Sequence, residues 1–206
     1  YGLAPIALSL LAGRMADRHG FHLPVAWSVG AALLGAALPV ATQHIAVLAA
    51  SGLLTGGAVA FAAVAIQREA GLMARDPSDL KRVFSWVALG PALSNTFAPV
   101  AAGLLIVHAG FRAAFAFGVL LPLVAAWAAW QVPRQASLPG GGVPTLRSAL
   151  GLLRHAHLRN LLLVNVAMAA AWDAHTFTVP VVGHARELSA SAIGAVLASF
   201  AVASTV

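Results

Sequence analysis

Long apolar segments, separated by short charged ones, limit how this chain can fold more than any other feature of its sequence. A helix of about 20 apolar residues is long enough to cross the ~30 Å hydrocarbon core of a bilayer. The chain is therefore predicted to be an all-α, polytopic membrane helix bundle with five complete spans and one partial span at each end. The segments are Tyr1–Ala12, Leu23–Gln43, Ile45–Ile66, Val83–Val107, Ala113–Val132, Leu161–Val182 and Leu188–Val206.

The composition disfavours the alternatives to a membrane helix bundle. Hydrophobic residues make up 60% of the chain and charged residues only 9%, whereas soluble domains carry roughly 25% charged residues. Strands of a membrane β-barrel would be about 10 residues long with strict alternation, and the Ala-, Leu- and Val-rich segments of this chain do not alternate. The chain has no cysteine, which excludes disulfides and thiolate metal sites within it.

The positions of the basic residues indicate an orientation in the membrane. If Gly13–Gly20 faces the cytoplasm, ten Lys and Arg residues lie on the cytoplasmic side, and only Arg112 and Arg186 lie outside. Because cytoplasmic loops carry an excess of Lys and Arg, residues 13–22, 67–82 and 131–160 are predicted to be cytoplasmic in a multi-pass plasma-membrane protein. The net charge of +6 is spread over separate loops, which fits contact with anionic membrane lipid and not with nucleic acid.

A proline- and glycine-rich connection divides the chain. It contains Pro133, Pro139, the triplet Gly140–Gly142 and Pro144, residues that cannot continue a helix. We expect an N-terminal bundle over 1–132, a cytoplasmic linker over 133–159 and the start of a second bundle over 160–206. Leucines at helical spacing with arginines between them predict a short amphipathic helix over 146–154 within the linker. Both chain ends fall inside apolar segments, so we expect the chain to be a piece of a longer protein.

The first charged turn resembles a known signature. In the major facilitator superfamily (MFS), a glycine, a small residue, an aspartate, a basic residue and a second glycine join helices 2 and 3. Phe21 and His22 stand where that family usually carries further basic residues. The matching positions are Gly13, Ala16, Asp17, Arg18 and Gly20.

Later segments resemble the same family in the same order. Trp86–Asn95 is similar to the helix 5 signature of its antiporters, with Gly90 and Pro91 kept. Phe111–Phe115 resembles the start of helix 6, and Leu188–Gly194 the start of helix 8. The resemblance therefore runs from within helix 2 to within helix 8 of a fold of two six-helix bundles. It tends towards the drug/proton antiporters, although Gly52 stands where many proton-coupled members carry an arginine.

The resemblance implies a secondary active transporter and not an enzyme. Such a protein moves a small solute by alternating access, here by efflux coupled to protons or another ion, and we expect a monomer without a cofactor. The sequence contains neither H-E-x-x-H nor G-x-x-x-x-G-K-[ST], so no metal site or ATP site is predicted. A membrane sensor or scaffold that uses the same fold without transport remains the alternative.

Two groups of residues are candidates for conformational roles. The first comprises Gly13, Asp17, Arg18 and Gly20. Asp17 can accept hydrogen bonds from the first amides of the next helix and pair with arginines, which would latch the cytoplasmic side when the bundles close. The second is Gly90 with Pro91, a kink that could move during transport. The competing interpretations are a helix cap among loop charges for Asp17 and a purely structural kink for Pro91.

Asp173 is the strongest candidate for ion coupling. It lies in the middle of an expected span, where an ionised carboxylate costs at least ~2.5–3.5 kcal/mol on insertion scales. It should therefore face a polar cavity or carry a proton. The competing interpretation is a buried partner of an arginine or histidine.

Four further residues are candidates for the coupling or solute cavity: His175, Asn165, Trp172 and Asn95. His175 lies about 200° around the helix from Asp173 and can titrate near neutral pH. Asn165 lies about 80° from Asp173, and Trp172 precedes it directly. Structural packing and interhelical hydrogen bonds are the competing interpretations for the histidine and the asparagines.

Overall fold

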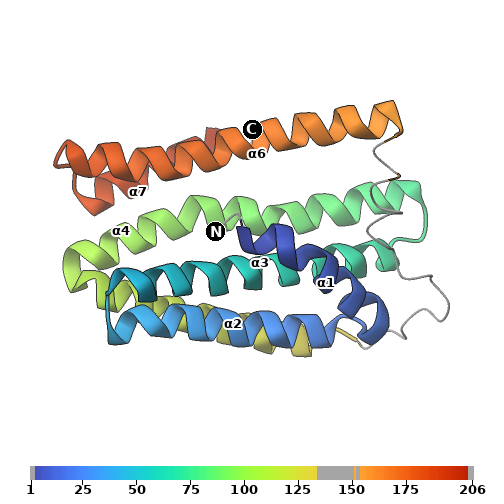
Figure 1. The fold of residues 1–206 in the computed structure, drawn as a ribbon, viewed down its shortest axis with the longest axis horizontal. Coiled ribbons are helices and arrows are strands. Elements are labelled where there is room, and N and C mark those ends of the chain that lie inside the picture. The colour runs from blue at the N-terminus through green and yellow to red at the C-terminus, as the bar shows by residue number, and fades with distance from the viewer. Residues whose placement is uncertain (1–2, 134–150, 152–153, 204–206) are drawn as a thin grey trace. The chain divides into compact units, whose positions relative to one another are not determined.

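A computed structural model describes residues 3–133, 151 and 154–203 of the chain. Within these residues the secondary structure is entirely helical (Figure 1), so the predicted all-α class is confirmed. The helices are α1 (Leu3–His19), α2 (His22–Ala41), α3 (Ile45–Met73), α4 (Pro77–Trp130), α6 (Ala156–Ala185) and α7 (Ala190–Ala203).

Three of the described helices, α2, α3 and α4, are long and apolar enough to cross a membrane. A straight helix of the 54 residues in α4 would be about 80 Å long, more than twice the hydrocarbon core. The helix is interrupted at Gly110, whose φ of 79° and ψ of 172° are not helical. The two spans expected at 83–107 and 113–132 therefore meet at this single residue.

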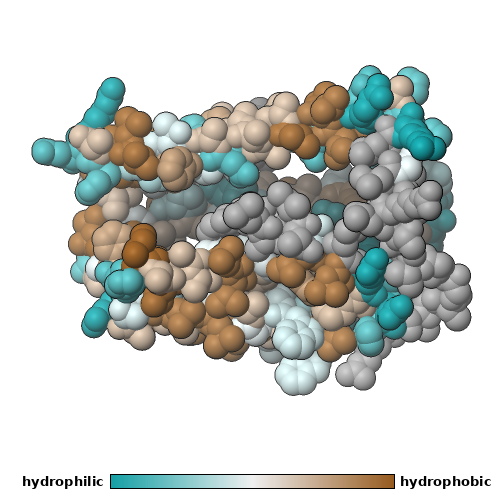
Figure 2. All heavy atoms as spheres, viewed as in Figure 1, coloured by the Kyte–Doolittle hydropathy of each residue, from teal (hydrophilic) through white to brown (hydrophobic). Residues whose placement is uncertain are grey.

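The chain divides into two compact units. One contains Tyr1–Leu93 and His108–Gly141, and the other contains Ser94–Val107 and Gly142–Val206. Part of α4 thus groups with α6 and α7, whereas the division into 1–132, 133–159 and 160–206 remains a prediction about the whole protein. In each unit, apolar side chains cover much of the helix surfaces and hydrophilic side chains gather near the helix ends (Figure 2).

In the first unit, small residues let α2 and α3 approach closely. A Cβ on Gly35 would lie 2.7 Å from Cγ2 of Thr55, so no larger residue fits there without movement. Ser51 Oγ donates a hydrogen bond to the Gly35 carbonyl at 2.6 Å, and Ser28 Oγ donates to the Ala58 carbonyl at 2.7 Å. Each helix therefore donates one side-chain hydrogen bond to the backbone of the other, as is common where membrane helices pack through small residues.

The turn between α1 and α2 is shorter than expected. The sequence suggested a turn over Gly13–Gly20, but α1 remains helical through His19, and the chain turns at Gly20, where φ is 73°. Only glycine adopts that angle without strain. The charged residues Arg14, Asp17 and Arg18 therefore project from the last turns of a helix. The expected start of the turn at Gly13 was wrong because charged residues can continue an apolar helix beyond the hydrocarbon core.

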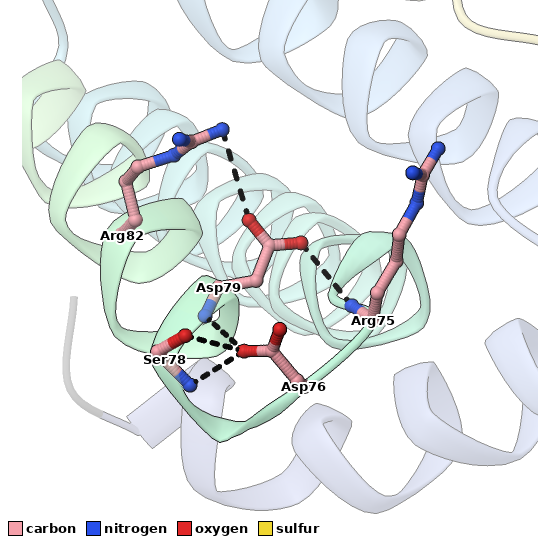
Figure 3. A network of polar contacts seen from close by, with 5 residues as sticks. All are labelled: Arg75, Asp76, Ser78, Asp79 and Arg82. Atoms are coloured by element: carbon pink, nitrogen blue, oxygen red, sulfur yellow. Dashed lines mark hydrogen bonds and ion pairs between the residues drawn. The ribbon is translucent and has the colours of Figure 1, made fainter.

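A hydrogen-bonded cap begins α4. Oδ1 of Asp76 accepts hydrogen bonds from the Ser78 hydroxyl at 2.6 Å and from the Ser78 and Asp79 amides, both at 2.8 Å (Figure 3). These bonds, above all the one from the Ser78 hydroxyl, lower the pKa of Asp76 from its ordinary value of 3.8. Asp79 accepts from the Arg75 amide and lies 3.8 Å from the Arg82 guanidinium. This capping network defines the first turn of α4.

In the second unit, glycines bring three helical segments into close contact. A Cβ on Gly183 of α6 would lie 2.7 Å from Cγ1 of Ile193 in α7. A Cβ on Gly103 of α4 would lie 2.5 Å from the Ala190 carbonyl oxygen, and a Cβ on Gly194 would collide with the Pro99 carbonyl oxygen. The segment 94–107 and α7 therefore cross backbone to backbone.

The central connection is described only in part. α6 begins at Ala156, four residues before the expected start of the second bundle. The amphipathic helix predicted over 146–154 lies outside the described residues, apart from Gly151 and Arg154.

Candidate functional site

An ion pair joins α1 to α3 in the first unit. Ala12 and Ala16 of α1 are fully buried, so the end of α1 lies close against a neighbouring helix. There, Nε of Arg68 in α3 donates to Oδ1 of Asp17 at 3.0 Å. The Asp17 side chain is 52% exposed and that of Arg68 is 15% exposed. A pair with one partner so exposed adds little stability by itself, so its geometry matters more than its strength.

Of the two kinds of partner expected for Asp17, the structure shows an arginine. Nε of Arg68 donates the hydrogen bond that the Asp17 carboxylate accepts, and Phe21, the N-cap residue of α2, makes no side-chain cap hydrogen bond. Arg18 and Gly13 lie on the same helix, and a Cβ on Gly13 would meet nothing within 4 Å. Of the four predicted latch residues, only Gly20 has a conformation that requires glycine.

Glu69 completes this cluster, and the sequence analysis missed it. The residue is 5% exposed. Its Oε2 lies 4.0 Å from the Arg68 guanidinium, and its Oε1 is buried without a hydrogen-bond partner among the described residues. The expected span ended at Ile66, but α3 continues to Met73. Ala58 and Ala65 are buried, and Glu69 follows them at helical spacing, so it lies on the same face of α3. This spacing is the signal in the sequence that could have indicated that Glu69 is buried.

In the second unit, Asp173 lies well inside α6. It is 12 residues from the end of that helix, which corresponds to about 18 Å along the axis. Its side chain is exposed, and no hydrogen bond or ion pair to its carboxylate is found within the described part of the chain. Its backbone carbonyl accepts a hydrogen bond from the Thr176 hydroxyl at 3.0 Å. The carboxylate of Asp173 is therefore exposed and unpaired among the described residues.

An aromatic cluster lies between α6 and α7. The His175 ring stacks on Phe200 with a centroid distance of 3.8 Å and an interplanar angle of 28°. Trp172 packs against the same phenylalanine at 5.2 Å. Nε2 of His175 is buried and has no hydrogen-bond partner among the residues described. The structure thus brings His175 and Trp172 together through Phe200, a residue that the sequence analysis did not select because nothing local marks it.

Asp173 does not share this cluster. Around the helix axis, Asp173 lies about 100° from Trp172 and about 200° from His175. Its carboxylate therefore points away from the helix face that packs on Phe200. Asn165 is seven residues before Trp172 and therefore close to it in helical phase. Asn165 and Asn95 are both exposed, and no side-chain hydrogen bond is found for either one within the described residues.

The predicted kink at Gly90 and Pro91 lies in a regular part of α4. The non-helical backbone angles in that helix occur at Gly110, and a Cβ on Gly90 would meet nothing within 4 Å. A role for these two residues in movement therefore remains a prediction.

Among the described residues, no group of three or more His, Asp and Glu side chains could hold a metal ion.

The fold is that of a multi-pass helical membrane protein. Glycine, alanine and serine make its interhelical contacts, and ionisable groups lie near a helix end and inside α6. The chain belongs to the Major Facilitator Superfamily, which it matches over residues 1–206. It is thus identified as part of a secondary transporter of small solutes and not an enzyme. Neither a curated protein nor a solved structure matches the chain.

Proposed function

We propose that the protein exports a small, hydrophobic solute by alternating access, in exchange for protons or another ion. Asp173 is the coupling residue in this proposal, and Trp172, His175, Asn165 and Asn95 contact the solute or line its path. We place the protein in the plasma membrane as a monomer, with residues 13–22, 67–82 and 131–160 in the cytoplasm.

The observation that carries the proposal is the unpaired carboxylate of Asp173. Ionisable residues within membrane helices are costly and therefore mark ion and solute pathways. The α7 helix contains no ionisable residue, and neither does the segment 94–107. Within the described part of the second unit, no basic side chain is paired with Asp173, which argues against the purely structural interpretation of this acid. A carboxylate without a fixed partner can exchange a proton or a cation during each cycle.

The Asp17 cluster supports a second part of the proposal, a latch on the cytoplasmic side. Arg68 lies between the exposed carboxylate of Asp17 and the buried carboxylate of Glu69, at 3.0 and 4.0 Å. If the neighbouring bundle supplies another charged group when the cytoplasmic side closes, Arg68 can exchange partners. Gly13, Arg18 and Gly20 would shape and charge this latch, while bending at Gly90 and Pro91 would accommodate the movement of the helix.

The proposal is tested with the full-length protein in proteoliposomes, with ethidium as the probe solute. We expect an imposed pH gradient to accelerate ethidium movement by the wild type. Asp173→Asn should abolish the dependence on the gradient, and Glu187→Gln, which removes an acid just beyond the end of α6, should keep it. Unchanged transport and unchanged pH dependence in Asp173→Asn would contradict the coupling role. Wild-type protein that moves no ethidium, with or without the imposed pH gradient, would contradict efflux of a hydrophobic compound.

A further inference from the structure

An apolar groove with a volume of about 350 Å³ lies between α1, α2 and α3. The transport proposal makes no use of it. The side chains that line it are accessible from outside, since Leu11 is 53% and Trp27 65% exposed. The main lining residues are Leu8, Leu11 and Met15 of α1, Trp27 and Ala31 of α2, and Phe61 of α3. The chemistry of this lining suits hydrocarbon, which surrounds apolar surfaces of membrane helices.

The groove runs along α1 from near its charged end, since Met15, Leu11 and Leu8 all line it. Met15 is five residues before the turn at Gly20, or about 7 Å along the helix, and Leu8 is about 10 Å deeper. The opening near Met15 therefore lies close to the headgroup region, and the floor near Leu8 lies within the hydrocarbon core. A Trp such as Trp27 beside the opening is typical of this boundary.

A cation lies at the polar end of the groove. Leu8, Leu11, Met15 and Arg18 follow one another at intervals of three, four and three residues, so they share one face of α1. Arg18 is exposed and has no ion pair within the described residues. The adjacent acid, Asp17, is already held by Arg68 at 3.0 Å and does not neutralise it. Arg14, also exposed, lies one helical turn away and adds a second positive charge.

We propose that this groove is a specific site for an anionic phospholipid, with one acyl chain along Leu8, Leu11 and Met15 and the phosphate at Arg18. Basic pockets between membrane helices bind anionic headgroups, and an apolar groove directly below the cation fits the attached chain. A transmembrane helix is 10–12 Å across, so a groove of this size accepts single side chains of a helix and not the helix itself. The site thus fits a lipid better than a second protein surface.

The test uses the full-length protein reconstituted in bilayers of equal amounts of phosphatidylglycerol and phosphatidylcholine. Native mass spectrometry after detergent extraction then counts and identifies the lipids that stay bound. We expect the wild type to retain phosphatidylglycerol preferentially. Because one basic residue near the surface contributes enough to change affinity roughly fivefold, Arg18→Gln should lower that retention about fivefold. Ala31→Phe, which fills the groove, should abolish it.

Arg75→Gln is the matched control, because Arg75 is an exposed arginine just before α4 that does not line the groove. It should retain lipid as the wild type does. Arg18→Gln alters only an exposed helix end, so the test remains valid even if Ala31→Phe does not fold. Equal retention of the two lipids by the wild type, or equal losses in Arg18→Gln and Arg75→Gln, would overturn the proposal. If the wild type retains no lipid and Ala31→Phe melts at a lower temperature than the wild type, a protein segment occupies the groove. That result would also overturn the proposal.

Discussion

The backbone crossing between the segment 94–107 and α7 makes a sharp prediction for Gly103→Ala. The added Cβ would lie 2.5 Å from the Ala190 carbonyl oxygen and 2.9 Å from Cα of Ser191. Ordinary contacts are about 3.5 Å, so the two backbones would have to separate by roughly 1 Å. Overpacking of this kind typically costs 1–3 kcal/mol. Because alanine favours a helix over glycine by about 1 kcal/mol, the net loss of stability should be about 0–2 kcal/mol.

Gly52→Ala provides the matched control for this effect. It makes the same chemical change inside α3, where the new Cβ would meet nothing within 4 Å, so it should gain the helix preference without the collision. The difference in unfolding free energy between the two variants should therefore be about 1–3 kcal/mol. Thermal unfolding of the purified full-length protein in detergent measures it, with Gly103→Ala melting several degrees below Gly52→Ala. Equal melting temperatures would refute the close crossing.

Three further predictions concern charged and polar contacts. Arg68→Gln should lower the melting temperature, because it leaves the buried carboxylate of Glu69 without its ion-pair partner at 4.0 Å, a loss that costs up to about 3–5 kcal/mol when both partners are buried. Adding Glu69→Gln should restore part of the loss; a double variant no more stable than the single one would contradict this. Asp76→Ala should destabilise the protein at neutral pH. Since folding lowers the pKa of Asp76 from 3.8, the stabilisation by its ionised form is present above pH 3.8 and disappears as the pH falls through the folded pKa; melting curves of wild type and variant across that range should converge. Ser51→Ala removes an interhelical hydrogen bond and should cost about 0.6 kcal/mol, up to about 1.7, whereas Ser85→Ala removes only a bond within its own helix and should cost less.

The sequence predicted α2, α3 and α4 as apolar spans because each leaves a continuous local signal, whereas α6, which covers the span expected over 161–182, is not among the described helices that are apolar enough to cross a membrane. Segments of about 20 apolar residues are visible without any tertiary information, and the MFS signatures indicated the family to which the chain belongs. The boundaries were less accurate. The Gly13–Gly20 segment was interpreted as a turn because it is charged, yet residues 14–19 belong to α1. Charged residues do not interrupt a helix that leaves the hydrocarbon core.

The candidate site was predictable only in part, because its contacts join residues that are distant in the chain. Asp17 and Asp173 stand out as acids at unusual positions. By contrast, Phe200 is one apolar residue among many, and its stacking on His175 depends on how α6 and α7 pack. The crossing at Gly103 and Gly194 likewise leaves no local mark, since glycines are frequent in membrane helices. Glu69 was hidden for a simpler reason, because it lies beyond the apolar part of α3.

The non-helical angles at Gly110 have a mechanical consequence. Elsewhere a loop of several residues can absorb a tilt of one helix without disturbing the next. Here two spans of α4 are joined by one residue whose φ of 79° and ψ of 172° fall in a region that essentially only glycine occupies. Only the two dihedral angles of this residue can change between the spans. A rotation of the first span must therefore either change these angles or rotate the second span with it. Glycines inserted beside Gly110 should therefore uncouple the two spans without changing the sequence of either one.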